Sequence, residues 1–355
     1  MSDTPSAIPQ AAATAGAARS PFTTALLHDD GLICGYAFTP RLPAREIGSA
    51  AEAAALIDAA TEGFIWVHLN LSHAATVHWL RAHAGLSERF HEEIEGGSRS
   101  ARIDRDGEGL LAVLNDVTYD FEFGARDVET LWMSVRQRLV VSVRKRPLRA
   151  VDHLRNDVRA GARLDNSIDL LDRLMQLQAD ELQRILRASS ERLDDVEDEV
   201  LSAHQVLPVR ELAGMRRLLV RLQRLLTPEP AALARVIARP PGWMGDQDVP
   251  HLTQAYEEFT LVLRDIAALQ DRVRLLQDEC STRLAEQTGR SVFTLTMVTV
   301  LALPINLISG MFGMNVGGIP LADHTSGFLL MVLAIGCVTG VIAWLVRRRV
   351  RPPER

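Results

Sequence analysis

The sequence SGMFGMNVGGIP, residues 309–320, separates two apolar segments near the end of this 355-residue chain. The segments run from Val292 to Phe312 and from Phe328 to Val346. Each is close to the roughly 20 residues that a helix needs to cross about 30 Å of hydrocarbon. We therefore predict two membrane spans, residues 292–312 and 328–346, joined by an outer loop at 313–327.

The charges beside these spans predict their orientation. Arg283 and Arg290 precede the first span, a basic tail at 347–355 follows the second, and residues 313–327 contain no Lys or Arg. Positive charge collects on the cytoplasmic side of a membrane. Both termini are therefore expected in the cytoplasm, and the loop is expected to face outward.

Overall composition excludes several classes of protein. The net charge of −6 offers no general basic field for nucleic acid. Cys34, Cys280 and Cys337 are isolated, so neither a disulfide framework nor a Cys-rich zinc site is indicated. No nucleophile-base pair, phosphate loop or His-Glu metal motif is present, and we expect neither an enzyme nor a bound cofactor.

The N-terminal half predicts an α+β cytoplasmic domain, a mixed sheet with helices, at residues 21–165, after a disordered tail at 1–20. Short apolar or alternating runs predict the strands, and Ser72 is expected to cap a helix that ends near His83. The expected strands are Gly31–Phe38, Phe64–Leu71, Gly109–Val117, Thr130–Val135 and Leu139–Val143.

Helical patterns follow this domain. Residues 166–249 predict an antiparallel pair, Ile168–Ala203 and Arg210–Leu226, and then a proline-rich loop from Pro228 to Gly242. A stalk helix is predicted at 250–291, continuing into the first span. Its heptad-like seam fits packing between copies or packing on the chain's own helix pair. The seam residues are Leu252, Tyr256, Phe259, Leu263, Ile266, Val273, Cys280 and Leu284.

Polar residues of the first span and its approach fall on one helix face. Thr288, Thr299 and Asn306 lie within about 20° of one another at 100° per residue. Two helices cannot enclose an aqueous path, so we expect several copies to surround a pore. The alternative is an asparagine that only joins helices. The predicted pore-lining residues are Thr288, Val292, Leu295, Thr299, Leu303 and Asn306.

The Gly-Met-Asn triad at residues 313–315 has a mechanical interpretation. Gly313, Gly317 and Gly318 let the backbone turn and expose carbonyl oxygens, while Asn315 adds an amide oxygen. A ring of such neutral oxygens can hold a divalent cation by its water shell. The alternative is a small-residue packing motif between helices.

These features together resemble the CorA/ZntB family of divalent metal ion transporters. The likeness extends to Trp66–Asn70, Gly107–Leu110 and Arg138–Arg144, and the VGGIP sequence after Asn315 looks more like the ZntB branch. The resemblance implies a homopentameric CorA-like funnel in a bacterial inner membrane. It also implies that Gly313, Met314 and Asn315 form the outer cation site.

The resemblance leaves the transported ion open. Likeness to ZntB implies Zn2+ as the transported ion, and it also implies coupling of transport to protons. Met314 instead matches the magnesium-type members, so Mg2+, Co2+ or Ni2+ is the alternative ion. Asp323 and His324 are the candidate ligands near the entrance. A membrane-anchored sensor that conducts nothing is the alternative of another class.

Two further groups of polar residues contain the residue types of a metal site. His73, His78 and His83 recur every five residues, about 140° apart on a helix, so a shared site is not expected. The acidic block at 194–199 fits a solvated face balanced by arginines better than a regulatory cation site.

Overall fold

A computed structural model describes residues 30–40, 42–59, 62–118, 128–202, 208–314 and 326–350. The predictions for the tail at 1–20 and for Asn315, Asp323 and His324 lie outside these described residues. The chain divides into two compact units, residues 1–274 and 275–355, and helix α8 contributes to both. Each unit is described by itself.

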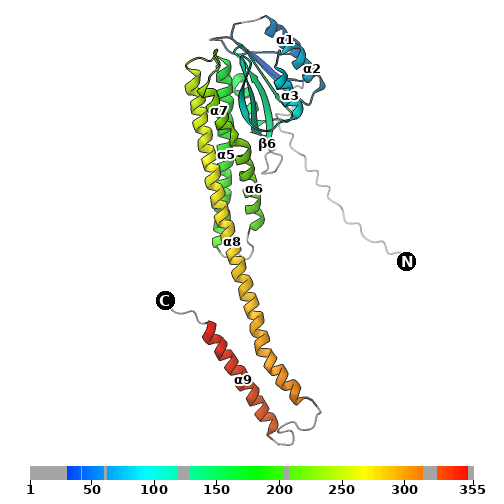
Figure 1. The fold of residues 1–355 in the computed structure, drawn as a ribbon, viewed down its shortest axis with the longest axis vertical. Coiled ribbons are helices and arrows are strands. Elements are labelled where there is room, and N and C mark those ends of the chain that lie inside the picture. The colour runs from blue at the N-terminus through cyan, green and yellow to red at the C-terminus, as the bar shows by residue number, and fades with distance from the viewer. Residues whose placement is uncertain are drawn as a thin grey trace, which may run out of the picture. The chain divides into compact units, whose positions relative to one another are not determined.

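A seven-stranded mixed sheet forms the centre of the first unit, with strand order β2-β1-β3-β7-β6-β5-β4 (Figure 1). β3 and β7 are parallel and every other neighbouring pair is antiparallel. All five predicted strands are confirmed, with ends shifted by at most two residues. The strands are Leu32–Phe38, Arg45–Glu46, Phe64–Asn70, Arg102–Asp106, Gly109–Val117, Val128–Val135 and Leu139–Arg144, β1 to β7 in order.

Three short helices cover one face of the sheet: α1 (Ala50–Asp58), α2 (Ala74–His83) and α3 (Glu88–Gly96) (Figure 1). Their apolar residues pack on the side chains that β3, β5 and β7 present to this face. The predicted cap of α2 is wrong by one residue. His73 accepts the N–H of Ala75, whereas the Ser72 hydroxyl donates to the carbonyl of Lys145.

The longer helices lie on the other side of the sheet: α4 (Arg149–Arg159), α5 (Ser167–Leu201), α6 (Val209–Leu226) and α7 (Pro228–Ala238) (Figure 1). The antiparallel pair is confirmed as α5 and α6, which Arg192 and Glu211 link by an ion pair. The loop expected from Pro228 is wrong. Pro228 and Pro230 occupy the first turn of α7, where a missing N–H costs no helical hydrogen bond.

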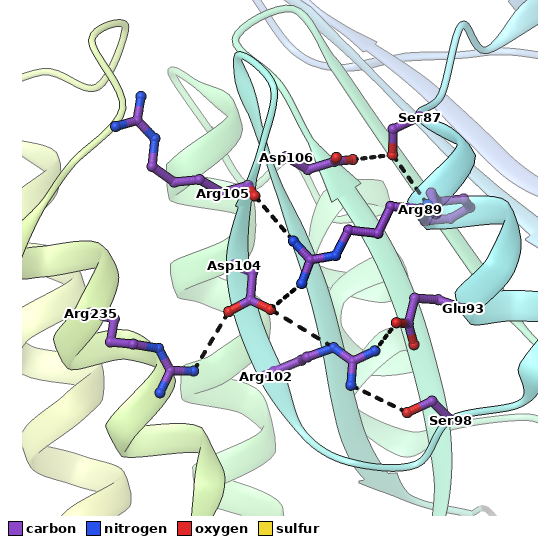
Figure 2. Close-up of polar contacts among 10 residues, drawn as sticks. Ser87, Arg89, Glu93, Ser98, Arg102, Asp104, Arg105, Asp106 and Arg235 are labelled. Atoms are coloured by element: carbon purple, nitrogen blue, oxygen red, sulfur yellow. Dashed lines mark hydrogen bonds and ion pairs between the residues drawn. The ribbon is translucent and has the colours of Figure 1, made fainter.

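A polar cluster closes the exposed edge of the sheet at β4. Figure 2 shows Asp104 between arginines from two helices: Arg89 of α3 donates to it at 2.6 Å, and Arg235 of α7 lies 3.7 Å away. Arg102 of β4 pairs with Glu93 of α3. An edge covered in this way has little capacity to pair with a foreign strand.

Helix α8 (Asp248–Phe312) is continuous over 65 residues, about 100 Å at 1.5 Å per residue, and α9 (Gly327–Val350) follows it. Five of the eight predicted seam residues are buried, Cys280 among them, whereas Leu284 is exposed. Leu252, Phe259, Ile266 and Val273 are buried inside the first unit, so they pack on the chain's own helices. Ala255, Val262 and Leu269 are the other buried positions along this part of α8, whereas Tyr256 and Leu263 are only half-buried.

Candidate cation pathway

The second unit contains two strongly apolar helical stretches that the chain itself does not cover. The outer part of α8 has a mean hydropathy of 2.0 and residues 327–345 of α9 have 2.5, and no residue of either stretch is buried. Leu295, Leu303 and Phe328 are 69%, 66% and 76% exposed. Apolar surface on this scale needs lipid or further protein around it.

The six residues predicted to line a pore all belong to α8 and are all exposed in the single chain. At 100° per residue they fall within an arc of about 80°, which Gly310 and Gly313 extend toward the end of the helix. One face of the helix therefore alternates hydroxyl or amide groups with apolar side chains. The residues are Thr288, Val292, Leu295, Thr299, Leu303 and Asn306.

The threonine hydroxyls on this face are bonded within their own helix. Thr288 donates to the carbonyl of Leu284 and Thr299 to the carbonyl of Leu295, each at 2.9 Å. The hydroxyl hydrogen of each threonine is used in this bond, so only the lone pairs of the hydroxyl oxygen remain available to groups outside the helix. Lone pairs suit a cation or the hydrogen atoms of its water shell.

Pro304 supplies a second polar feature beside Asn306. It lies inside α8 and has no N–H, so the carbonyl of Val300 loses its helical partner. Asn306 follows two residues later and its side chain is exposed. An amide in hydrocarbon without partners costs several kcal/mol, so this position requires polar surroundings.

The helix ends where the Gly-Met-Asn triad begins. The last helical residue is Phe312, and the N–H of Gly313 still donates to the carbonyl of Ser309 at 3.0 Å. Met314 is 55% exposed. The structure thus describes the first two triad residues, while the contribution of Asn315 stays a prediction.

The other polar groups considered for metal binding have structural partners. Asp194 and Glu197 of the acidic block both pair with Arg272 of α8. His73 caps α2, and His78 and His83 are exposed at separate positions on that helix. Among the described residues, no group of three or more His, Cys, Asp or Glu side chains is arranged to hold a metal ion.

Sequence reasoning missed the buried carboxyls of the first unit, among them Asp116 of β5 and Glu229 of α7. Desolvation raises the pKa of Glu229 to about 8 and that of Asp116 to about 7. For Glu229 the only sequence signal is Pro-Glu-Pro at 228–230, a pattern typical of a loop.

Fold and spans together define an integral membrane protein whose α+β domain precedes a long helix and two apolar helices. Residues 61–348 match the family described as CorA-like Mg2+ transporter protein. The chain belongs to this CorA-like family of divalent cation transporters.

Named relatives agree with this assignment. The divalent cation transporter CmaX of Pseudomonas aeruginosa is 30% identical over 320 residues, which cover 90% of this chain and 96% of that protein. The zinc transport protein ZntB of Pectobacterium atrosepticum is 26% identical over 283 residues, or 80% of this chain and 86% of that protein. These names describe transporters rather than enzymes.

Solved structures show the same fold. The full-length CmaX protein superimposes with a TM-score of 0.76 at 27% identity, covering 92% of this chain and 99% of that one. The CorA magnesium transporter from Methanocaldococcus jannaschii gives a TM-score of 0.71 at 16% identity, covering 88% and 97%.

Proposed function

We propose that copies of this chain form a homopentameric pore that moves divalent cations, with Zn2+ as the main substrate. The observation that carries the proposal is the exposed line of Thr288, Thr299 and Asn306 on one unbroken helix. A helix that served only as an anchor would have no use for it. When several copies turn these residues toward a common axis, the residues line a hydrated path. The apolar surfaces of the helices then face the lipid.

The proposed route has an outer site and an apolar interior. Gly313, Met314 and Asn315 surround a hydrated cation at the mouth, with Asp323 and His324 as additional ligands in the outer loop. Leu295 and Leu303 form apolar rings between the polar levels. Such rings can stop conduction by excluding water when the helices draw together.

Zinc is preferred over magnesium because several relatives carry the name zinc transport protein. Mg2+, Co2+ and Ni2+ are the alternative substrates, since the family description names Mg2+ and Met314 follows the magnesium-type triad. Coupling to a proton gradient belongs to the zinc version of the proposal. We place the protein in a bacterial inner membrane with both termini in the cytoplasm, because the arginines flank the spans on that side.

The test is metal flux into proteoliposomes. Wild-type protein should carry Zn2+ faster than Mg2+, and a pH gradient should accelerate Zn2+. Asn315→Ala should abolish flux while the oligomer persists on size exclusion with light scattering. Thr294→Val, about 120° from the pore line, is the matched control and should conduct normally. Unchanged flux in Asn315→Ala, or a monomer, would refute the pore.

A further inference from the structure

A hollow of about 300 Å3 opens in the first unit where β6 turns into β7. Its apolar walls come from the end of α1 and the starts of β3 and β7, and they are formed by Leu56, Ile57, Ile65 and Leu139. Its polar residues come from the end of α2 and from the β6–β7 turn, and they are His83, Arg136 and Arg138. A volume of this size is at the lower limit of pockets that hold small organic molecules.

Arg136 is held in place by three separate contacts. Its backbone N–H donates to the carbonyl of Leu139 at 2.9 Å, which closes the turn. Its Nη2 donates to the carbonyl of Ala84, at the end of α2, at 2.6 Å. Its aliphatic stem lies on Gly109 of β5, where an added Cβ would come within 2.7 Å of the Arg136 Cγ. The guanidinium is therefore positioned before any ligand arrives, which lowers the entropy cost of binding.

The two guanidinium groups of this turn have no counterion. Among the described residues, the remaining N–H groups of the Arg136 side chain have no hydrogen-bond partner, and neither Arg136 nor Arg138 forms an ion pair. Burial lowers the pKa of Arg136, and the charge of Asp106 on β4 offsets only part of this effect. Asp106 is itself bonded to the hydroxyl of Ser87. The hollow therefore combines unneutralised positive charge with apolar walls.

We propose that this hollow binds a small organic anion whose carboxylate or phosphate group pairs with the two arginines and whose apolar body lies on the walls. The planar guanidinium fork matches either kind of oxyanion in a bidentate arrangement. The negative end of α2 disfavours an anion, but Arg136 already bonds a terminal carbonyl there. The leucine and isoleucine side chains gain from burial against an apolar body, which inorganic phosphate does not supply. The site lies wholly in the first unit, so the proposal does not depend on the pore or on its cation.

Isothermal titration of the full-length protein in detergent tests the site with two probes, benzoate and phenyl phosphate. Saturable binding of at least one probe is expected, and the tighter of the two identifies the preferred head group. Arg138→Gln should weaken this binding about tenfold, because it removes charge-assisted hydrogen bonds to an oxyanion. Arg105→Gln, which changes an exposed arginine of β4, is the matched control and should bind as wild type does. Unchanged affinity in Arg138→Gln would overturn the proposal, and so would the absence of saturable binding.

Two analogues separate the contribution of the charge from that of the apolar body. Benzamide is the neutral analogue of benzoate, and inorganic phosphate lacks the apolar body of phenyl phosphate. Each should bind about tenfold more weakly than its parent probe or not at all. Equal affinity of benzamide would show that the arginines are not used, and equal affinity of inorganic phosphate would show that the walls are not used. Either result would overturn the proposal.

Hydrogen exchange of the wild-type protein locates the site without any variant. A saturating concentration of the probe should raise the protection of amides in residues 54–58, 83–86 and 136–140, because a ligand of the folded form suppresses local opening. Protection confined to other parts of the chain would show that the probe binds elsewhere, and the proposed site would then be wrong.

Discussion

Arg149 Nη1 lies 2.6 Å from Oε1 of Glu181, and only 1% of the Glu181 side chain is exposed. This pair fastens α4 to α5. Removing the arginine leaves a buried carboxylate that retains only Arg184, whose own side chain is 54% exposed.

Arg149→Met should therefore lower the free energy of unfolding by about 2 kcal/mol, since a buried charge that loses a partner is strongly destabilising. Thermal unfolding monitored by tryptophan fluorescence measures this. Arg81→Met is the control, because Arg81 and Glu95 form an exposed pair worth less than about 1 kcal/mol. Equal effects of the two substitutions would contradict the assigned role.

The buried His68 gives the domain a pH-dependent stability. Its Nδ1 lies 2.8 Å from the hydroxyl of Ser142, and desolvation, then Arg144 and Arg155, hold its pKa well below 6.5. Below pH 6.5, His68 is therefore protonated in the unfolded chain, whereas it stays neutral in the folded chain. Stability from this group is present above pH 6.5 and is lost as pH falls.

Replacing His68 with Gln should flatten the loss of stability between pH 6.5 and pH 5. The melting temperature across this range is the measurement, with His78→Gln at an exposed site as the control. An unchanged slope in His68→Gln would show that other groups cause the acid response.

Moving the amide of Asn306 to another face of α8 tests whether its position on the pore-lining face matters, or only the presence of a polar group. In the double variant Ile305→Asn with Asn306→Ile, the composition is kept and the amide turns by about 100°. Cation flux in proteoliposomes should fall at least tenfold. An amide that only joins helices could tolerate the exchange, and full flux with an intact oligomer would count against a lining role.

Leu295 offers a test of the proposed apolar constriction. Leu295→Ser should raise basal flux severalfold, because a polar ring retains water where an apolar ring excludes it. Val298→Ser, about 60° off the same arc, is the control and should leave basal flux near that of wild type. Lower flux in Leu295→Ser would place the gate elsewhere.

Gly63 marks a tight contact at the start of β3. Its φ is 89°, and an added Cβ would lie 1.9 Å from the carbonyl oxygen of Phe38. Gly63→Ala should destabilise the protein by more than about 2 kcal/mol through strain and collision. Gly161→Ala is the comparison, because φ is 97° there but no atom lies near the added Cβ. A smaller loss is expected in that variant.

Five of the seven described strands and α8 could be predicted because their patterns are local, whereas β2 and β4 were not predicted. β3 and β7 are short apolar runs with clear ends, and from Pro250 to Phe312 only Gly289 and Pro304 interrupt the helix formers. The missing α7 has an equally local reason. Two prolines usually signal a loop, and only their place in the first turn makes them compatible with a helix.

Other features depend on packing that a sequence does not contain. Tyr256 and Ala255 both fit the apolar spacing of α8, and the larger residue is the wrong choice, because Ala255 is fully buried whereas Tyr256 is only half-buried. Glu229 looks like an ordinary loop carboxylate until β5 is placed beside it. The face of Thr288, Thr299 and Asn306 follows from spacing alone, but its orientation toward a pore stays a prediction.

Pro304 removes one backbone hydrogen bond from α8, about two turns before the helix ends. Elsewhere along α8, bending must stretch an intact backbone hydrogen bond, whereas at Pro304 that hydrogen bond is absent. The stiffness of α8 is therefore lowest between Val300 and Pro304. In the proposed pore, the mouth can widen by flexing at this level, without unwinding the turns that carry Asn306.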